Sequence, residues 1–157
     1  MTITLQSVSL DQKDILRELL RVYEQELTGD PNPSEYKYLD SYWQKPNRKA
    51  FFIMVDNAVG GFVLVNQHLL IQPNGNNLSE FYIIPKYRGL KIGRQAAIQV
   101  FELFKGNWEL RELQSNTKAH RFWLNVINDY TQGNYKETVL NSADWQGPVQ
   151  TFNNLTT

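Results

Sequence analysis

The most informative part of the sequence is Phe81-Tyr-Ile-Ile-Pro-Lys-Tyr-Arg-Gly-Leu-Lys-Ile-Gly-Arg-Gln-Ala-Ala97. A β-rich run ends at a proline, a basic loop with glycines follows, and the sequence then becomes helical. The first turn of a helix leaves backbone N–H groups unpaired and carries partial positive charge, so it attracts phosphate oxygens. Arg88, Lys91 and Arg94 add three cations. The stretch therefore predicts an anion site between a strand and a helix.

Length and composition limit the classes of protein. The 157 residues favour one domain, residues 1–157, that buries a core without disulfides. Sixteen basic and sixteen acidic residues cancel, so no overall field recruits nucleic acid or an anionic membrane. Cysteine is absent, and His68 and His120 lack metal-motif spacing, so we expect no metal. The chain also lacks a signal-like start and a long apolar run, which predicts a soluble, cytoplasmic protein.

Periodicity along the chain predicts the order β-α-α-β-β-β-α-β-α-β-β, an α+β or α/β sheet. The apolar run 50–55 predicts a central strand buried on both faces. A second helix is expected over about 35–43, and strand 78–84 leads into the basic loop. A third helix is expected over about 91–105, and Ser115 or Asn116 caps the fourth.

The basic loop resembles a known cofactor motif. Arg88-Gly89-Leu90-Lys91-Ile92-Gly93 is similar to the motif of the GNAT N-acetyltransferase superfamily: Arg or Gln, two residues, Gly, one residue, then Gly or Ala. Lys91 stands at the first glycine position. Asn116-Thr-Lys-Ala-His-Arg-Phe-Trp123 resembles the family's pattern at the start of the fourth helix, and the element order resembles its fold. Glu80-Phe-Tyr82 and the segment 145–150 also resemble a bacterial subgroup of predicted acetyltransferases.

This resemblance implies a GNAT-like mixed, mostly antiparallel central sheet, with helices on both faces and a splayed slot between strands 4 and 5. The slot would take pantetheine, the loop 88–94 would hold the pyrophosphate of acetyl-CoA, and Asn116 would contact the cofactor. Lys91 would either crowd the pyrophosphate or contact it. The residues expected at acetyl-CoA are Ile83, Ile84, Arg88, Gly89, Leu90, Lys91, Ile92, Gly93, Arg94 and Asn116.

Acetyl transfer to an amine needs a base for the nucleophile, a donor for the oxyanion and an acid for the thiolate. Strand alternation puts Glu80 and Tyr82 on one face, so both are catalytic candidates, with Glu80 as the base; a solvated strand glutamate is the alternative. The resemblance implies a backbone N–H near Ile83 or Ile84 as the oxyanion donor. Trp123 stands where the family often has a tyrosine acid, and indole cannot take that role.

The leading interpretation is an acetyl-CoA-dependent N-acetyltransferase acting on an amine of a small molecule or peptide by direct attack. The alternatives are a CoA-binding sensor or interaction module, to which Lys91 and Trp123 point, and a phosphate-ligand protein, for which Walker spacing is missing. The aromatic residues of the first two helices favour a small, amino-acid-like acceptor. As in some relatives, the two last strands allow pairing in a homodimer.

Overall fold

The computed structural model describes residues 1–156. Its elements are β1 (Ile3–Ser7), η1 (Leu10–Gln12), α1 (Lys13–Thr28), α2 (Ser41–Gln44), β2 (Lys49–Val55), β3 (Ala58–Asn66), β4 (Asn76–Ile83), η2 (Pro85–Tyr87), α3 (Ile92–Leu103), β5 (Asn107–Arg111), α4 (Thr117–Thr131), β6 (Lys136–Asn141) and β7 (Gln146–Asn153). The order of strands and α-helices is the predicted one, and two short 3-10 helices are added.

Among residues 1–156, seven strands form a mixed sheet in the order β1-β2-β3-β4-β5-β7-β6. The pairs β1–β2, β2–β3, β5–β7 and β6–β7 are antiparallel. β4 and β5 are parallel, through the residue pairs Asn76–Trp108 and Asn77–Glu109. The predicted mixed, mostly antiparallel fold class is therefore confirmed. β2 lies between β1 and β3, as its continuous apolar run predicted.

The chain divides into two compact units. The first consists of Met1–Val65 and Glu80–Gly93, and the second of Asn66–Ser79 and the chain from Arg94 onward. That residues 1–157 act as one domain stays a prediction. No helix among the described residues is long and apolar enough to cross a membrane.

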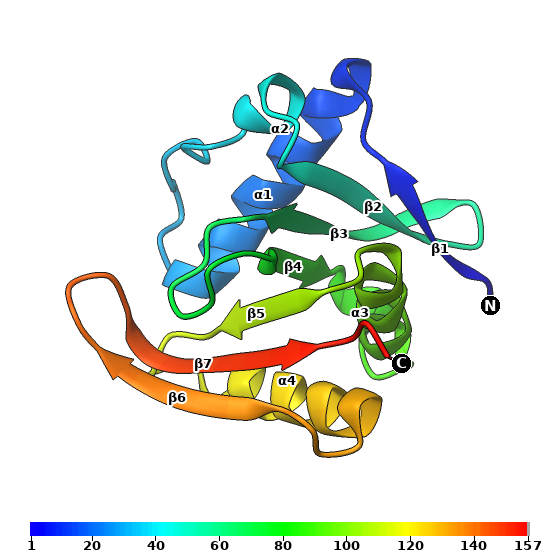
Figure 1. The fold of residues 1–157 in the computed structure, drawn as a ribbon. Helices are drawn as coiled ribbons and strands as arrows, with labels where there is room; N and C mark the ends of the chain where they lie inside the picture. The colour runs from blue at the N-terminus through cyan, green and yellow to red at the C-terminus, as the bar shows by residue number, and fades with distance from the viewer. Residues whose placement is uncertain (157) are drawn as a thin grey trace. The chain divides into compact units, whose positions relative to one another are not determined.

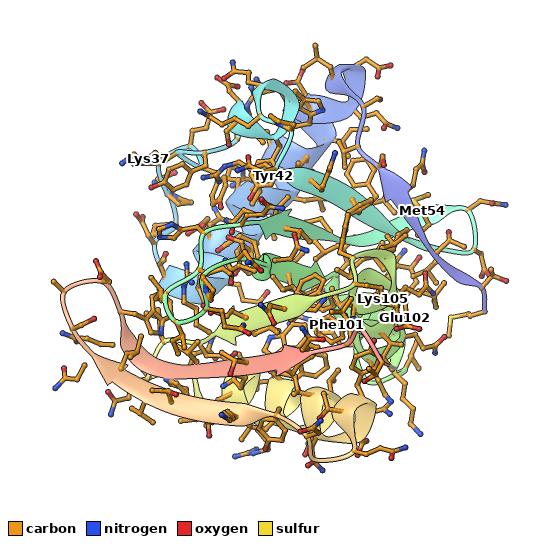
Figure 2. All side chains as sticks on the ribbon, viewed as in Figure 1. Lys37, Tyr42, Met54, Phe101, Glu102 and Lys105 are labelled. Carbon is orange, nitrogen blue, oxygen red and sulfur yellow. The ribbon has the colours of Figure 1, made fainter. Side chains whose placement is uncertain are left out.

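In the first unit, α1 packs on β2 and β3 (Figure 1). Leu16 and Leu20, one helical turn apart, join Phe52 and Phe62 in one buried cluster. Tyr42 of α2 belongs to the same cluster (Figure 2). The amphipathic spacing of α1 thus places Leu16 and Leu20 in the core of the first unit.

The predicted helix over 35–43 is wrong, because α2 contains only Ser41–Gln44. Upstream of it, the Leu39 N–H donates to the Tyr36 carbonyl and the Ser41 N–H donates to the Tyr38 carbonyl. These are i to i+3 turns, which do not continue as an α-helix. The third helix is also shorter than predicted and begins at Ile92.

The glycine pair at the start of β3 permits a close backbone approach in the first unit. A Cβ at Gly61 would overlap the carbonyl oxygen of Tyr82. The β2–β3 register pairs Ile53 with Gly61 and Met54 with Val59, so the chain bulges at Gly60. Larger residues at Gly61 would push β3 and the Glu80–Ile83 part of β4 apart.

The second unit has an aromatic core. The ring of Phe101 in α3 lies 5.1 Å from Trp108, 5.2 Å from Tyr130 and 5.1 Å from Phe152, measured between centroids. β6 and β7 form a long antiparallel hairpin, drawn in orange and red in Figure 1. At the end of α3, Glu102 pairs with Lys105, which follows the helix, at 2.7 Å, and both are labelled near Phe101 in Figure 2.

Candidate active site

Glu80 of β4 is half-buried and acts electrostatically on two tyrosines of the first unit. Burial raises the pKa of Tyr23 well above its usual value, and the Glu80 charge raises it further. Burial also raises the pKa of Tyr42, whereas the Arg48 charge lowers it and the Glu80 charge raises it. The Glu80 carboxylate thus lies close enough to both phenols to affect their ionisation.

Tyr82, the second catalytic candidate, lies in the core with 5% of its surface exposed. Its ring is 5.8 Å from Tyr23 and 5.8 Å from Phe62, and the Arg88 guanidinium lies 5.4 Å from its centroid. Burial raises the pKa of Tyr82, which makes the phenol a weaker acid. Its catalytic role stays a prediction, and its packing gives it a structural one.

Some backbone groups at the end of β4 already form hydrogen bonds within the protein. The Ile84 N–H donates to the Gly60 carbonyl at 2.9 Å, and the Ile84 carbonyl accepts from the Tyr87 N–H at 2.9 Å. The Ile83 carbonyl accepts from Nε of Arg88 at 2.9 Å. Neighbouring N–H groups of a strand point to opposite edges, so the Ile83 N–H points away from Gly60. Of the two predicted oxyanion donors, Ile83 is the one that this geometry favours.

The loop between η2 and α3 has the backbone geometry of an anion site. Gly89 and Lys91 both adopt left-handed conformations, with φ of 78° and 61°, and α3 begins at Ile92. Left-handed residues in a turn aim backbone N–H groups into a shared concavity, and a helix N-terminus adds its own. A Cβ added at Gly89 would meet no described atom within 4 Å. This backbone conformation suits a phosphate group, and phosphate binding by the loop stays a prediction.

Two of the three predicted cations have carboxylate partners. The Arg88 guanidinium donates to both Glu26 oxygens, at 2.7 and 2.9 Å. Arg94 in α3 pairs with Asp129 of α4 at 2.8 Å. Lys91 is exposed, and no carboxylate of residues 1–156 lies within 4.0 Å of its ammonium group. Lys91 is thus the loop cation whose charge stays uncompensated.

Asn116, one of the two predicted caps, is the N-cap of α4. Its side-chain oxygen accepts from the Ala119 N–H at 3.2 Å. A cofactor contact by Asn116 stays a prediction, and it would have to come from the amide nitrogen or the backbone. Trp123, at the family's tyrosine position, is 7% exposed and packs edge-to-face on Phe122 at 4.9 Å.

The two histidines belong to the second unit. His68 is exposed in the connection after β3, and its backbone N–H donates to Asn66. His120 on α4 bonds Glu137 of β6 at 2.5 Å. No group of three His, Asp or Glu side chains that suits a metal occurs in the part of the chain described.

Sequence reasoning missed Glu109, a buried carboxylate in β5. Glu109 is fully buried and accepts backbone N–H bonds from Leu70 at 2.8 Å, Ile71 at 3.2 Å and Gln72 at 2.6 Å. A carboxylate that accepts several backbone donors holds a loop in place. The sequence signal that could have revealed Glu109 is an acidic residue between the apolar residues of the strand.

Glu112, just after β5, is a second buried acid that the sequence did not reveal. One of its oxygens accepts from Gln150 at 2.8 Å, and Gln150 also donates to Glu137 at 2.9 Å. Burial raises the pKa of Glu112 to about 8; the Gln150 bond lowers it and the Glu137 charge raises it. Glu112 is therefore protonated at neutral pH.

The first unit also contains solvent-accessible cavities. One of about 360 Å³ lies between α1 and the connection to α2, and Arg17, Arg21, Glu24 and Glu35 are among its lining residues. Another, of about 500 Å³, lies beside α2 and the start of β2. Both volumes are in the range of small-molecule sites.

Solved acetyltransferase structures share this fold. An acetyltransferase from Thermus thermophilus superposes with a TM-score of 0.72 and 17% identity, over 98% of this chain and 97% of that one. The PaiA N-acetyltransferase from Thermoplasma acidophilum, solved with coenzyme A, gives 0.65 and 15% over 98% and 99%. The aminoglycoside acetyltransferase AAC(6')-Ib, solved with coenzyme A, gives 0.68 and 15% over 97% and 95%. The fold is thus that of acetyltransferases.

Sequence comparison assigns the family. Residues 14–125 match the acetyltransferase (GNAT) family, and the chain belongs to it. No curated protein sequence matches the chain. The matched range includes β4, the loop 88–93, α3, β5 and the first part of α4. The family supports acetyl transfer as the general activity and confirms the resemblance read from the loop.

Proposed function

We propose that this protein is an N-acetyltransferase that moves the acetyl group of acetyl-CoA to an amine by direct attack. The observation that carries the proposal is the loop of Gly89 and Lys91, whose left-handed backbone leads into α3 in a chain of the acetyltransferase family. Two similar structures hold coenzyme A, and another AAC(6')-Ib structure also holds kanamycin, which supports a small-molecule acceptor.

The loop residues Arg88 to Arg94 would bind the pyrophosphate mainly through backbone N–H groups, because both arginines already pair with carboxylates. Lys91 would supply the free positive charge. Arg88 would stabilise the loop through its bonds to Glu26 and the Ile83 carbonyl. Leu90 and Gly93 complete the loop, and the buried Ile92 side chain, 1% exposed, anchors it.

The reaction needs no covalent enzyme intermediate. The amine nitrogen attacks the thioester carbonyl, the carbon–sulfur bond breaks, and the products are an N-acetyl amine and CoA. The Ile83 N–H would stabilise the oxyanion. Glu80 would accept the proton that the amine loses, directly or through water, and the thiolate would take a proton from solvent or from an acid that stays unassigned.

Replacement of Glu80 with Gln tests the base. We expect kcat/KM for the amine to fall by about 10²-fold or more at neutral pH, since positioned bases contribute that much. Affinity for acetyl-CoA, measured by calorimetry, should change little, because Glu80 does not belong to the loop 88–93. E18Q is the matched control, as Glu18 is exposed on α1 and pairs with Arg21. Full turnover by E80Q would remove Glu80 from the mechanism.

The second candidate function is a CoA-binding sensor. Trp123 favours it, because this buried indole cannot protonate a thiolate. Calorimetry with CoA and thiol-release assays against a panel of amines separate the two functions: binding with turnover supports the enzyme, and binding without it supports the sensor. A homodimer and a cytoplasmic location stay predictions.

A further inference from the structure

The cavity beside α2 has a strongly cationic lining. It lies in the first unit between the end of β1, α2 and the start of β2, and its volume is about 500 Å³. Lys45, Arg48 and Lys49 all line it, and none of its described lining residues is an Asp or Glu. The rings of Tyr42 and Trp43 form part of the wall. Such a lining suits a small anion with an attached apolar or aromatic part.

The neighbouring cavity of the same unit shows that this charge is unusual. There, Arg17 bonds Glu35 at 2.5 Å and also pairs with Asp14, while Arg21 bonds Glu18. Each lining arginine of that cavity therefore has a carboxylate partner. In the cavity beside α2, within residues 1–156, no carboxylate lies within 4.0 Å of Arg48 or of either lysine. Of the two cavities, the one beside α2 is therefore the one whose cations lack carboxylate partners.

Arg48 is also held in position by aromatic rings. Its guanidinium carbon lies 5.2 Å from the centroid of Tyr38 and 5.7 Å from that of Tyr42. Trp43 is fixed as well, since its indole N–H donates to the Val8 carbonyl at 3.0 Å. A guanidinium held between tyrosines loses little further entropy when it binds a carboxylate in two-point fashion.

Tyr42 connects this cavity with Glu80. Tyr42 lines the cavity, and its ring centroid lies 5.7 Å from the Arg48 guanidinium carbon. Burial raises the pKa of Tyr42, the Arg48 charge lowers it and the Glu80 charge raises it, so both charged groups act on this phenol. A ligand that carries an amine at one end and an anionic group at the other matches this pair of charges. A plain diamine would leave Arg48 unpaired and would place a cation near it.

We infer that Arg48 binds an anionic group of the acetyl acceptor, so that the acceptors are small amines that also carry a carboxylate, such as amino acids. This inference rests on the proposed function, because it assigns the amine to Glu80. Arg48 is then a specificity-determining residue: it binds and orients the acceptor and takes no part in proton transfer. Lys45 and Lys49 add long-range attraction that salt screens.

Matched pairs of acceptors test the inference. Acetyl transfer is measured for 4-aminobutyrate against propylamine and for L-lysine against cadaverine, each pair differing by one carboxylate. We expect kcat/KM to be about 10-fold to 100-fold higher for the acid of each pair, as one charge-assisted bond discriminates on that scale. R48M should abolish the preference by lowering only the values for the acids, and R48K should restore part of it.

Control variants and a binding measurement separate the possible failures. R21M, which changes a paired arginine of the other cavity, should keep the preference. Calorimetry of 4-aminobutyrate and propylamine on the CoA complex gives a readout that needs no turnover. If neither CoA nor any amine binds, the proposed function fails. If amines are acetylated without preference for the acid, or if R48M affects both members of a pair equally, only the inference fails.

Free anions provide one further arm of the test. Inorganic phosphate is added to the CoA complex, and its binding is measured with wild-type protein and with R48M. Phosphate that competes with 4-aminobutyrate but not with propylamine supports the acceptor site. Phosphate that binds through Arg48 without affecting the acetylation of either amine would overturn the assignment and mark a separate anion site.

Discussion

At the scale of the residue, Lys91 combines an unfavourable backbone with an uncompensated charge. Its φ of 61° is costly for a residue with a Cβ, by about 1 kcal/mol. We expect K91G to keep or slightly raise the free energy of unfolding, because the glycine removes strain but costs about 0.5–1 kcal/mol in entropy. CoA affinity should fall about threefold to tenfold, and less at high salt, as a phosphate contact is lost.

K91Q separates the two effects of that change. It keeps the Cβ at the left-handed position and removes the charge, so CoA affinity should fall without any gain in stability. Calorimetry and urea unfolding measure both quantities. Tighter CoA binding by K91G would instead mean that Lys91 crowds the pyrophosphate.

At the scale of the element, the Arg88–Glu26 pair ties α1 to the loop that follows η2. The two-point geometry, with N–O distances of 2.7 and 2.9 Å, is favourable for a partly exposed pair. A double-mutant cycle with R88A, E26A and the double variant should give a coupling energy of about 0.5–1 kcal/mol in urea unfolding. R88A alone should cost more than E26A, since it also loses the Ile83 bond and the stacking on Tyr82.

The same pair predicts an effect on ligand binding. R88A should weaken CoA binding, because the loop loses its support from the Ile83 carbonyl and α1. Additive stabilities, or unchanged CoA affinity in R88A, would contradict the supporting role. The R21Q variant on the same helix is the control, because the one bonding partner of Arg21 among residues 1–156 is the exposed Glu18.

At the scale of the whole molecule, Glu112 makes stability depend on pH. Its pKa of about 8 in the folded state lies above the usual value of 4.5, mainly because of burial. The folded protein therefore holds a proton that the unfolded chain releases, so stability from this group is full below about pH 4.5 and is lost as pH rises to 8. His120 and Glu137 face the same network.

E112Q should remove this dependence. The neutral amide keeps an oxygen that can accept from the Gln150 amide nitrogen, so the free energy of unfolding should stay nearly flat between pH 5 and 8. Wild-type stability should fall by about 1.4 kcal/mol per unit of pKa difference at most. Urea unfolding at several pH values measures it. E109Q is the contrast: it should destabilise at every pH, because the backbone donors at 70–72 lose an acceptor. If the free energy of unfolding depends on pH in the same way in wild type and E112Q, Glu112 is not the source of the pH dependence.

Sequence alone was enough to predict the order of strands and helices, the central place of β2, a cap at Ser115 or Asn116 and the loop that leads to the family. These features depend on neighbours a few residues apart, through alternation, helical spacing and turn chemistry, so local patterns carry them. The prediction of a helix over 35–43 was wrong, because local spacing did not reveal the turns around Tyr36 and Tyr38.

The partner of each functional side chain depends on the tertiary structure. Arg88 meets Glu26 across 62 positions of sequence, and Arg48 lies between tyrosines that the sequence assigned to a helix. Burial of Glu112 and of Tyr82 likewise depends on packing by distant elements. Charge pairing and desolvation are set by three-dimensional neighbours rather than by chain neighbours, so the sequence pointed to the cofactor, whereas the proposal for the acceptor needed the fold.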